Sequence, residues 1–285
     1  MSYKITIVMP VFNGEKTILN AINSLKFQTF KDWHCIIIND GSTDGTKNIL
    51  DSISDNRFRV VNFKINKGRS IARQTALEMI ESTYMCMLDA DDYYYPHKLD
   101  MQFNFMENNP EITLMSTTWS IVNEDNELYS VVSFAKNVVK YKYNQYANYS
   151  QVPHASSIIR VSDIGSVKYN INLRYAEDTD FMRRLLINKN YVVVNDLTYV
   201  YNRDRSFSLE KYINSVNQLL KAFYLLPVSK FEKAEEYIKQ KIKICLVFML
   251  IKAGGLKWYM SRMGRTPNMS ETHEFDKIKK EIFRV

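Results

Sequence analysis

The feature of this sequence that most constrains its fold is a regular alternation of continuously apolar segments with amphipathic ones. Four short apolar runs predict β-strands, at residues 5–9, 35–38, 59–63 and 84–88. Between them, apolar side chains recur every three or four positions, which predicts helices at residues 16–25, 46–53 and 71–80. A strand that is apolar on both faces is buried on both faces, as in a parallel sheet covered by helices. We therefore expect an α/β fold with a mostly parallel, Rossmann-like central sheet.

Polar residues gather where each of these strands ends. Taken singly, each cluster has a structural explanation, because serine, threonine and glycine are the usual residues of helix caps and turns. In a parallel sheet, however, the carboxyl ends of the strands lie at one edge, and ligands bind there. Four successive clusters therefore predict one binding site at that edge. They are residues 10–15 (Pro-Val-Phe-Asn-Gly-Glu), 39–46 (Asn-Asp-Gly-Ser-Thr-Asp-Gly-Thr), 66–73 (Asn-Lys-Gly-Arg-Ser-Ile-Ala-Arg) and 89–92 (Asp-Ala-Asp-Asp).

Composition excludes several classes of protein. The chain has 285 residues, 46% of them hydrophobic, which is ample material for a core and argues against wholesale disorder. The longest uninterrupted apolar run, residues 244–251, is much shorter than a membrane span. Three cysteines (Cys35, Cys86 and Cys245) lack metal-ligand spacing and fit reduced thiols. The first residues have no signal-peptide pattern, so we expect a cytoplasmic protein.

The positive charge of the chain is confined to its last third. Residues 1–202 carry 21 basic and 22 acidic side chains, whereas residues 203–285 carry 17 and 9. Because residues 211–260 mix lysines with a helical apolar pattern, we expect residues 203–285 to form a basic, mainly helical extension. Such a surface favours peripheral contact with an anionic membrane. Packing on the rest of the chain, or a contact in a homo-oligomer, explains the same pattern.

Five motifs in the first 202 residues together resemble the inverting family-2 glycosyltransferases with the GT-A fold, many of which build bacterial surface polysaccharides. They occur in the family's order and at family-like spacing, and are Pro10-Val11-Phe12-Asn13, Asn39-Asp40-Gly41-Ser42-Thr43-Asp44, Asn66-Lys67-Gly68 with Ala72-Arg73, Asp89-Ala90-Asp91-Asp92, and Glu177-Asp178. One departure is Gln74, where the family usually has asparagine. The resemblance implies a catalytic domain at residues 1–202, with a nucleotide-binding half at 1–110 and an acceptor half at 111–202.

The resemblance also implies a reaction. It is the metal-dependent transfer of one sugar from a nucleotide sugar, with UDP favoured as the nucleotide, to a hydroxyl of a growing or lipid-linked surface glycan. The sequence has neither a Gln-x-x-Arg-Trp motif nor a spanning helix, both features of processive synthases, so we expect a non-processive enzyme. Its lipid-linked acceptor would bring it to the inner face of the cell membrane.

Two other functional classes fit the sequence less well. A basic nucleic-acid-binding protein is disfavoured because the strand-end clusters are acidic and would repel phosphate in the absence of a metal. A catalytically silent scaffold on the same fold is disfavoured because Asp40, Asp91 and Asp178 are all present.

The expected donor site centres on Asp40, whose carboxylate, by the resemblance, accepts a hydrogen bond from the N3–H group of uracil. Arg73 lies near a predicted helix start, where its guanidinium group would approach phosphate oxygens or the base. A surface arginine is the alternative interpretation of Arg73. The other expected donor-site residues are Pro10, Val11, Phe12, Asn13, Glu15, Gly68, Asp89 and Ala90.

Asp89 and Asp91 form the expected metal motif. Carboxylates two residues apart on an extended segment point to the same side, and hard oxygen ligands suit Mg²⁺ or Mn²⁺. We assign Asp91 to the metal, and Asp89 to the ribose or to a metal-bound water. The metal would bridge the two phosphates and stabilise the charge of the departing nucleoside diphosphate.

Three acidic residues begin a predicted helix after residue 176. A structural role alone explains Glu177, Asp178 and Asp180, because carboxylates in a first turn complement the helix dipole. In the functional interpretation, one of them is the general base that takes the proton of the acceptor hydroxyl. The resemblance favours Asp178 over Glu177, with Asp180 third.

The acceptor half offers further candidates. His154 lies between the donor half and the acidic helix, and is expected to touch the acceptor or the metal if it is functional; a structural, hydrogen-bonded histidine is the alternative. A basic loop with Arg203, Arg205 and Ser208 is expected to close over the diphosphate.

Overall fold

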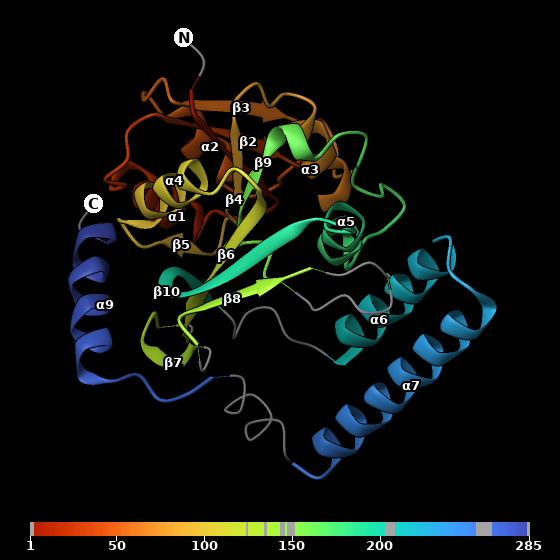
Figure 1. The fold of residues 1–285 in the computed structure, drawn as a ribbon. Coiled ribbons are helices and arrows are strands. Elements are labelled where there is room, and N and C mark those ends of the chain that lie inside the picture. Colours follow the sequence, from red (N-terminus) through yellow and green to blue (C-terminus); the bar gives the residue numbers. More distant parts are fainter. Residues whose placement is uncertain are drawn as a thin grey trace.

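The computed structural model describes residues 3–123, 125–133, 136–142, 146, 152–202, 209–254 and 264–283. Its strands form one sheet, with helices on both faces (Figure 1). The strands are β1 (Ile5–Val11), β2 (Trp33–Asn39), β3 (Phe58–Asn62), β4 (Tyr84–Met87), β5 (Tyr93–Tyr94), β6 (Ile112–Val122), β7 (Leu128–Val132), β8 (Val138–Tyr141), β9 (Ile158–Arg160) and β10 (Asn190–Asn202). The α-helices are α1 (Ile18–Lys26), α2 (Thr46–Asp51), α3 (Arg69–Leu77), α4 (Lys98–Asn108), α5 (Glu177–Leu185), α6 (Leu209–Tyr224), α7 (Lys230–Lys252) and α9 (Met269–Ile282).

The central strands of the sheet are parallel, which confirms the predicted fold class. The strand order is β3-β2-β1-β4-β9-β6-β10-β5, with β7 paired to β6 and β8 paired to β10. Parallel pairing joins β3, β2, β1 and β4, and also joins β6 to β10. Each antiparallel pair includes one of the short strands β5, β7, β8 and β9. The first four strands therefore end at one edge, as the sequence pattern predicts.

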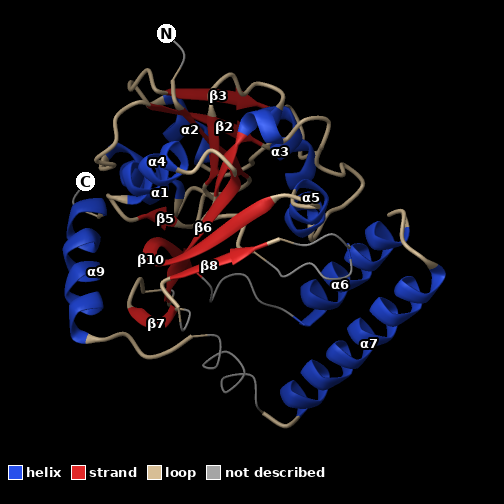
Figure 2. Cartoon of the chain, viewed as in Figure 1, coloured by secondary structure: helices blue, strands red, loops and turns tan. Residues whose placement is uncertain are grey.

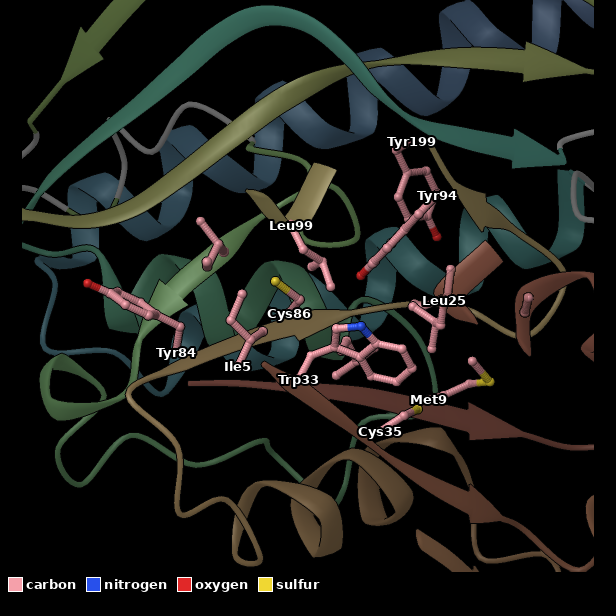
Figure 3. Close-up of a cluster of buried hydrophobic side chains, with 14 of the residues drawn as sticks. Ile5, Met9, Leu25, Trp33, Cys35, Tyr84, Cys86, Tyr94, Leu99 and Tyr199 are labelled. Atoms are coloured by element: carbon pink, nitrogen blue, oxygen red, sulfur yellow. The ribbon is translucent and has the colours of Figure 1, made fainter. Parts of the chain in front are cut away.

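Alternate side chains of β1 enter two separate cores. Ile7 and Met9 pack with α1, α2 and α4 on one face of the sheet, and Figure 3 shows part of this cluster around Trp33. Val8 packs with α3 and α5 on the other face. The helices lie on both sides of the strands in Figure 2. Burial on both faces is the physical reason that this strand is continuously apolar.

Strand β1 is longer than the sequence predicts. We expected it to stop at Pro10, but it continues to Val11, whose carbonyl oxygen accepts a hydrogen bond from the amide of Asp40 (2.8 Å). The backbone N–H and C=O groups of Val8 point towards β4, since the Val8 carbonyl oxygen accepts a hydrogen bond from the amide of Leu88. The backbone of Pro10, two residues later, points the same way. Pairing with β4 has already ended at Val8, so the N–H group that proline lacks has no partner to lose.

The C-terminal region is helical in its described parts, and its helices pack in two places. Helices α6 and α7 lie side by side and join the body through α5 (Figure 1). Helix α9 instead packs near α1 and β5, where Phe275, Ile278 and Ile282 are buried with Tyr93 and Val200. Among the described helices, none is long and apolar enough to cross a membrane.

Candidate active site

The loops after β1 and β2 are joined by hydrogen bonds between their side chains and backbones. Asn13 has a left-handed backbone (φ 54°). Its side-chain oxygen accepts a hydrogen bond from the Thr43 backbone amide at 2.8 Å, and its backbone amide donates one to Ser42 Oγ at 3.0 Å. Glu15 accepts from the Gly45 amide at 2.9 Å. These bonds explain why both motifs are polar, and they fix the wall of the cavity described below.

Asp40 organises the loop that leads into α3. Its side chain is buried, and its two oxygens accept hydrogen bonds from the amides of Lys67 (2.7 Å) and Gly68 (2.9 Å). Gly68 has a φ of 96°, a backbone conformation that favours glycine. The aspartate and the glycine together set the position at which α3 begins.

Three adjoining cavities follow the carboxyl edge of the sheet. Their volumes are about 390, 540 and 440 Å³, and Arg69 lines all three. The first is lined by Pro10, Val11, Phe12, Asp40, Asn66, Lys67, Gly68, Arg69, Ala72, Arg174 and Tyr175. The second is lined by residues 10–17, Asp44, Arg69, Asp89, Ala90, Asp91 and Tyr201. The third is lined by Arg69, Asp89, Trp119, residues 153–156, Asp178, Tyr199 and Tyr201.

Arg73 is buried and is not among the residues that line these three cavities. Its side chain is 2% exposed, and it donates to Asp89 Oδ1 at 2.8 Å and to Glu177 Oε1 at 2.6 Å. Burial opposes the charge on Arg73, but the two carboxylates outweigh it and raise its pKa. A permanently charged guanidinium group thus joins the end of β4 to the start of α5. Arg69, one helical turn earlier, also pairs with Glu177 Oε1 at 3.0 Å.

The three acidic residues at the start of α5 have different environments. Glu177 is buried against Arg73 and Arg69, and burial raises its pKa. Asp180 is buried against Arg184. Only Asp178 among the three lines a cavity, the third one. Burial opposes ionisation of Asp178, yet the nearby Arg73 charge prevails and lowers its pKa, so the carboxylate is ionised at neutral pH and can accept a proton.

The acidic run after β4 divides into cavity-lining and buried carboxylates. Asp89 and Asp91 both line the second cavity. Asp92 is buried and accepts hydrogen bonds from the Tyr199 hydroxyl (2.6 Å) and the Asn202 amide (2.8 Å). Burial, with Asp91 and Asp89 nearby, raises the pKa of Asp92. Asp92 therefore anchors the end of β10 beside the motif.

The donor set at Asp89 and Asp91 suits a divalent cation shared with a ligand. Within the described ranges, no group of three histidine, cysteine or acidic side chains is placed to hold a metal. Mg²⁺ commonly takes only one or two carboxylates from the protein and completes its shell with substrate phosphates and water. Two carboxylates lining one cavity match that requirement.

His154 lies in the wall of the third cavity with Asp178. Its Nε2 forms a 2.9 Å hydrogen bond with the Tyr169 hydroxyl, while its Nδ1 is buried without a partner among the described residues. Burial, and then the Arg73 charge, lower the pKa of His154 to about 4, so the imidazole is neutral. A neutral ring with one unused nitrogen can exchange a hydrogen bond with a ligand hydroxyl.

The structure therefore brings predicted residues of all five motifs to one edge, with Asp178 and His154 at its far end. From the third motif, Gly68 lines the first cavity, whereas Arg73 is buried. Arg203, Arg205 and Ser208 lie outside the described residues. Sequence analysis missed several cavity-lining residues, among them Arg69, Trp119, Tyr199 and Tyr201, and also Arg174 and Tyr175 of the first cavity. A basic residue directly after Gly68, at a helix start, was a usable signal for Arg69; the aromatic residues had none.

The sequence matches the family described as "Glycosyl transferase family 2" over residues 6–165, more than half of the chain. One curated relative is the Escherichia coli "UDP-Glc:alpha-D-GlcNAc-diphosphoundecaprenol beta-1,3-glucosyltransferase WfgD". It is 33% identical over 123 residues, which cover 43% of this chain and 48% of that protein. The match thus spans about half of that relative's length.

Two solved structures share the fold. Staphylococcus aureus TarS 1-349, in complex with UDP-GlcNAc, has a TM-score of 0.64 at 18% identity and covers 98% of this chain and 80% of that one. The Pyrobaculum calidifontis mannosyltransferase PcManGT, in complex with GDP-Man and Mn²⁺, has a TM-score of 0.60 at 12% identity and covers 100% and 88%. At these identities the likeness concerns the fold.

Proposed function

The chain belongs to glycosyl transferase family 2, and we propose that it moves one sugar from a UDP-sugar to a hydroxyl of a bacterial surface glycan, with inversion at the anomeric carbon. The observation that carries this proposal is the position of Asp178. It is an ionised carboxylate in the last of three adjoining cavities, whereas its acidic neighbours Glu177 and Asp180 are buried in ion pairs. The names of WfgD and of the TarS complex support UDP as the nucleotide.

The nucleoside would occupy the first cavity, next to Asp40. Each oxygen of that carboxylate already accepts one backbone hydrogen bond, and a carboxylate oxygen has capacity for a second, from the N3–H of uracil. Phe12 is 48% exposed at the border of the first two cavities, where its ring offers a face for the base. Uracil specificity would therefore come from Asp40, and base stacking from Phe12.

The diphosphate would lie in the second cavity, between Arg69 and the carboxylates of Asp89 and Asp91. Arg69 stands at the first position of α3, where its side chain and the helix N-terminus both favour an anion. Asp91 is the main candidate ligand for Mg²⁺ or Mn²⁺, because Asp89 shares an oxygen with Arg73. A cation bound there neutralises charge on the leaving diphosphate.

The transfer step would use Asp178 as the general base. Its carboxylate takes the proton of the acceptor hydroxyl as the oxygen attacks the anomeric carbon from the face opposite the diphosphate. Arg73 keeps Asp178 ionised by its charge, while Glu177 holds Arg73 in place. His154, through Nδ1, would exchange a hydrogen bond with a sugar or acceptor hydroxyl and so orient it. A lipid-linked acceptor is the substrate class that the WfgD name supports.

Nucleotide binding tests this proposal directly. In the presence of Mn²⁺, UDP should raise the melting temperature of the protein more than GDP, ADP or CMP at equal concentration, because bound ligand stabilises the folded state. Asp40→Asn should lose this preference, since an amide cannot replace both acceptor oxygens, whereas Asp55→Asn, an exchange at an aspartate outside the three cavities, should keep it. Equal shifts with all four nucleotides, or none, would refute the UDP assignment.

A further inference from the structure

Helix α7 presents a continuous apolar face that no described part of the chain covers. Phe231, Ile238, Ile242, Leu246 and Met249 are 77%, 58%, 56%, 52% and 57% exposed. Their spacing of three, four or seven residues places them on one side of the helix. Glu236 and Val247, the buried residues of α7, project from the opposite side. The exposed set, here called the outer face of α7, is therefore a surface feature of the folded chain.

Lysines border the outer face on both sides. By helical geometry, Lys239 and Lys243 lie along one border, and Lys241 and Lys252 along the other. The segment from residue 237 to residue 252 has no acidic residue. Glu232 and Glu235 belong to the first two turns, where Glu235 lines a surface hollow of the outer face with Phe231, Ile238 and Ile242. Long lysine side chains can lay their stems on apolar material while their ammonium groups reach solvent. Lys239 is 66% exposed with its Nζ 3.8 Å from Glu236 Oε2, and Lys241 donates to Asn217 Oδ1 of α6 at 3.3 Å. The C-terminal half of α7 thus combines apolar contact with positive charge.

The outer face is held in a fixed relation to the catalytic cleft. Helix α7 packs on α6, and α6 packs on α5, the helix that carries Asp178. Arg183 of α5 pairs with the buried Glu236 of α7 at 3.8 Å and lies over the ring of Phe223 of α6, 5.0 Å from its centroid. A buried ion pair and a ring contact connect three helices. These contacts fix the position of α7 relative to α5.

We propose that the outer face of α7 docks on an anionic phospholipid surface. A helix with an apolar stripe between rows of lysine lies in the plane of a membrane interface, with its apolar side chains among the acyl chains and its lysines at the headgroups. A second copy of the chain is the less suitable occupant, because a two-fold contact would bring the lysine rows of both copies together. Charge complementarity selects the anionic lipid.

This proposal deepens the proposed function, on which it rests for the lipid-linked acceptor. Docking through α7 would turn the α5 end of the cleft towards the bilayer, with α6 between α5 and the docked helix. An acceptor sugar joined to a membrane lipid would then reach Asp178 without leaving the membrane. The proposed site for the nucleotide, at the other end of the cleft, needs no lipid.

Co-sedimentation with vesicles tests the docking. The full chain should bind vesicles of phosphatidylcholine with phosphatidylglycerol, and bind pure phosphatidylcholine weakly, with a strong salt dependence because screening acts within about 8 Å at physiological ionic strength. Lys239→Gln with Lys243→Gln should weaken partitioning about 25-fold, at about fivefold per lysine. Lys277→Gln with Lys280→Gln, two exposed lysines of α9, is the matched control and should retain binding.

A second pair of variants tests the apolar contact. Ile242→Glu should reduce partitioning at least about tenfold, whereas Ile171→Glu, at an isoleucine of equal exposure (55% against 56%), should not. Absence of vesicle binding in the parent overturns the docking. So does a parent that self-associates without binding vesicles, if Ile242→Glu abolishes that self-association. UDP binding by the same samples separates the two ideas, because it tests the proposed function without the membrane.

Discussion

The buried guanidinium group of Arg73 is the side chain whose removal tests the construction of the site most severely. Removing one partner of a buried ion pair typically costs about 3–5 kcal/mol, because the other charge stays buried. Two features place Arg73→Met near the lower limit, at about 3 kcal/mol. Glu177 keeps Arg69 at 3.0 Å, and the Asp89 side chain is 24% exposed, so water can solvate it.

The loss should depend on pH. Burial already raises the pKa of Glu177, and without Arg73 it should rise further. A carboxyl group whose pKa is raised in the folded state takes up a proton more readily there than in the unfolded chain. Its contribution to stability is therefore lost as the pH rises from the ordinary range of a glutamate towards the raised pKa. Arg73→Met should be less destabilised at about pH 5 than at about pH 7.5.

Urea unfolding at the two pH values measures both effects. A double variant, Arg73→Met with Glu177→Gln, should recover part of the lost free energy at the higher pH, because it removes the stranded charge. Arg57→Met, at a partly exposed pair with Asp55 (22% and 21% exposed), is the control and should cost about 1 kcal/mol or less. A deficit for Arg73→Met below about 1 kcal/mol, or one that is the same at both pH values, would refute the role given to this network.

Three further predictions follow from the same geometry. Tyr199→Phe leaves the buried Asp92 without its 2.6 Å hydrogen bond and should cost about 1–3 kcal/mol in urea unfolding; an unchanged midpoint would contradict this. Asp91→Ala should weaken UDP binding in Mn²⁺ and make it insensitive to EDTA, as measured by calorimetry; parental affinity in Mn²⁺ would dismiss the metal assignment. Gly68→Ala, at φ 96°, should cost about 1–2 kcal/mol and raise the Kd for UDP, whereas Gly165→Ala, also at positive φ (57°), should leave the Kd unchanged.

Local patterns in the sequence predict much of the fold, because each expected strand and helix of the first 110 residues is decided by its own apolar periodicity. The exception is Pro10. Whether a proline can stay in a strand depends on where the neighbouring strand ends, and β4 leaves β1 at Val8. That information is not in the residues around Pro10.

A site residue is predictable where it belongs to a local motif that itself lines a cavity, as for Asp40 and Asp91. The ion pair of Arg73 with Glu177 joins residues 104 positions apart, so no local pattern indicates that Arg73 is buried. The same holds for Trp119, which comes from β6, far along the chain from the motifs that share its cavity. Residues that line a cavity from distant strands need the assembled sheet to be recognised.

Asp178→Asn is the most direct test of the central claim, because it removes basicity and keeps the shape of the side chain. A general base acts on the acceptor proton in the transition state, so its loss should spare UDP binding and lower the transfer rate by at least about a hundredfold. Asp180→Asn, two residues further along α5 and paired with Arg184, is the matched control.

The measurement is UDP release from the UDP-sugar with the acceptor that turns over fastest, beside the Kd for UDP of each protein. We predict a parental Kd for both variants, with transfer lost in Asp178→Asn and retained in Asp180→Asn. Near-parental transfer by Asp178→Asn would contradict the assignment of the base, and would contradict with it the proposal that the third cavity is where the sugar is transferred.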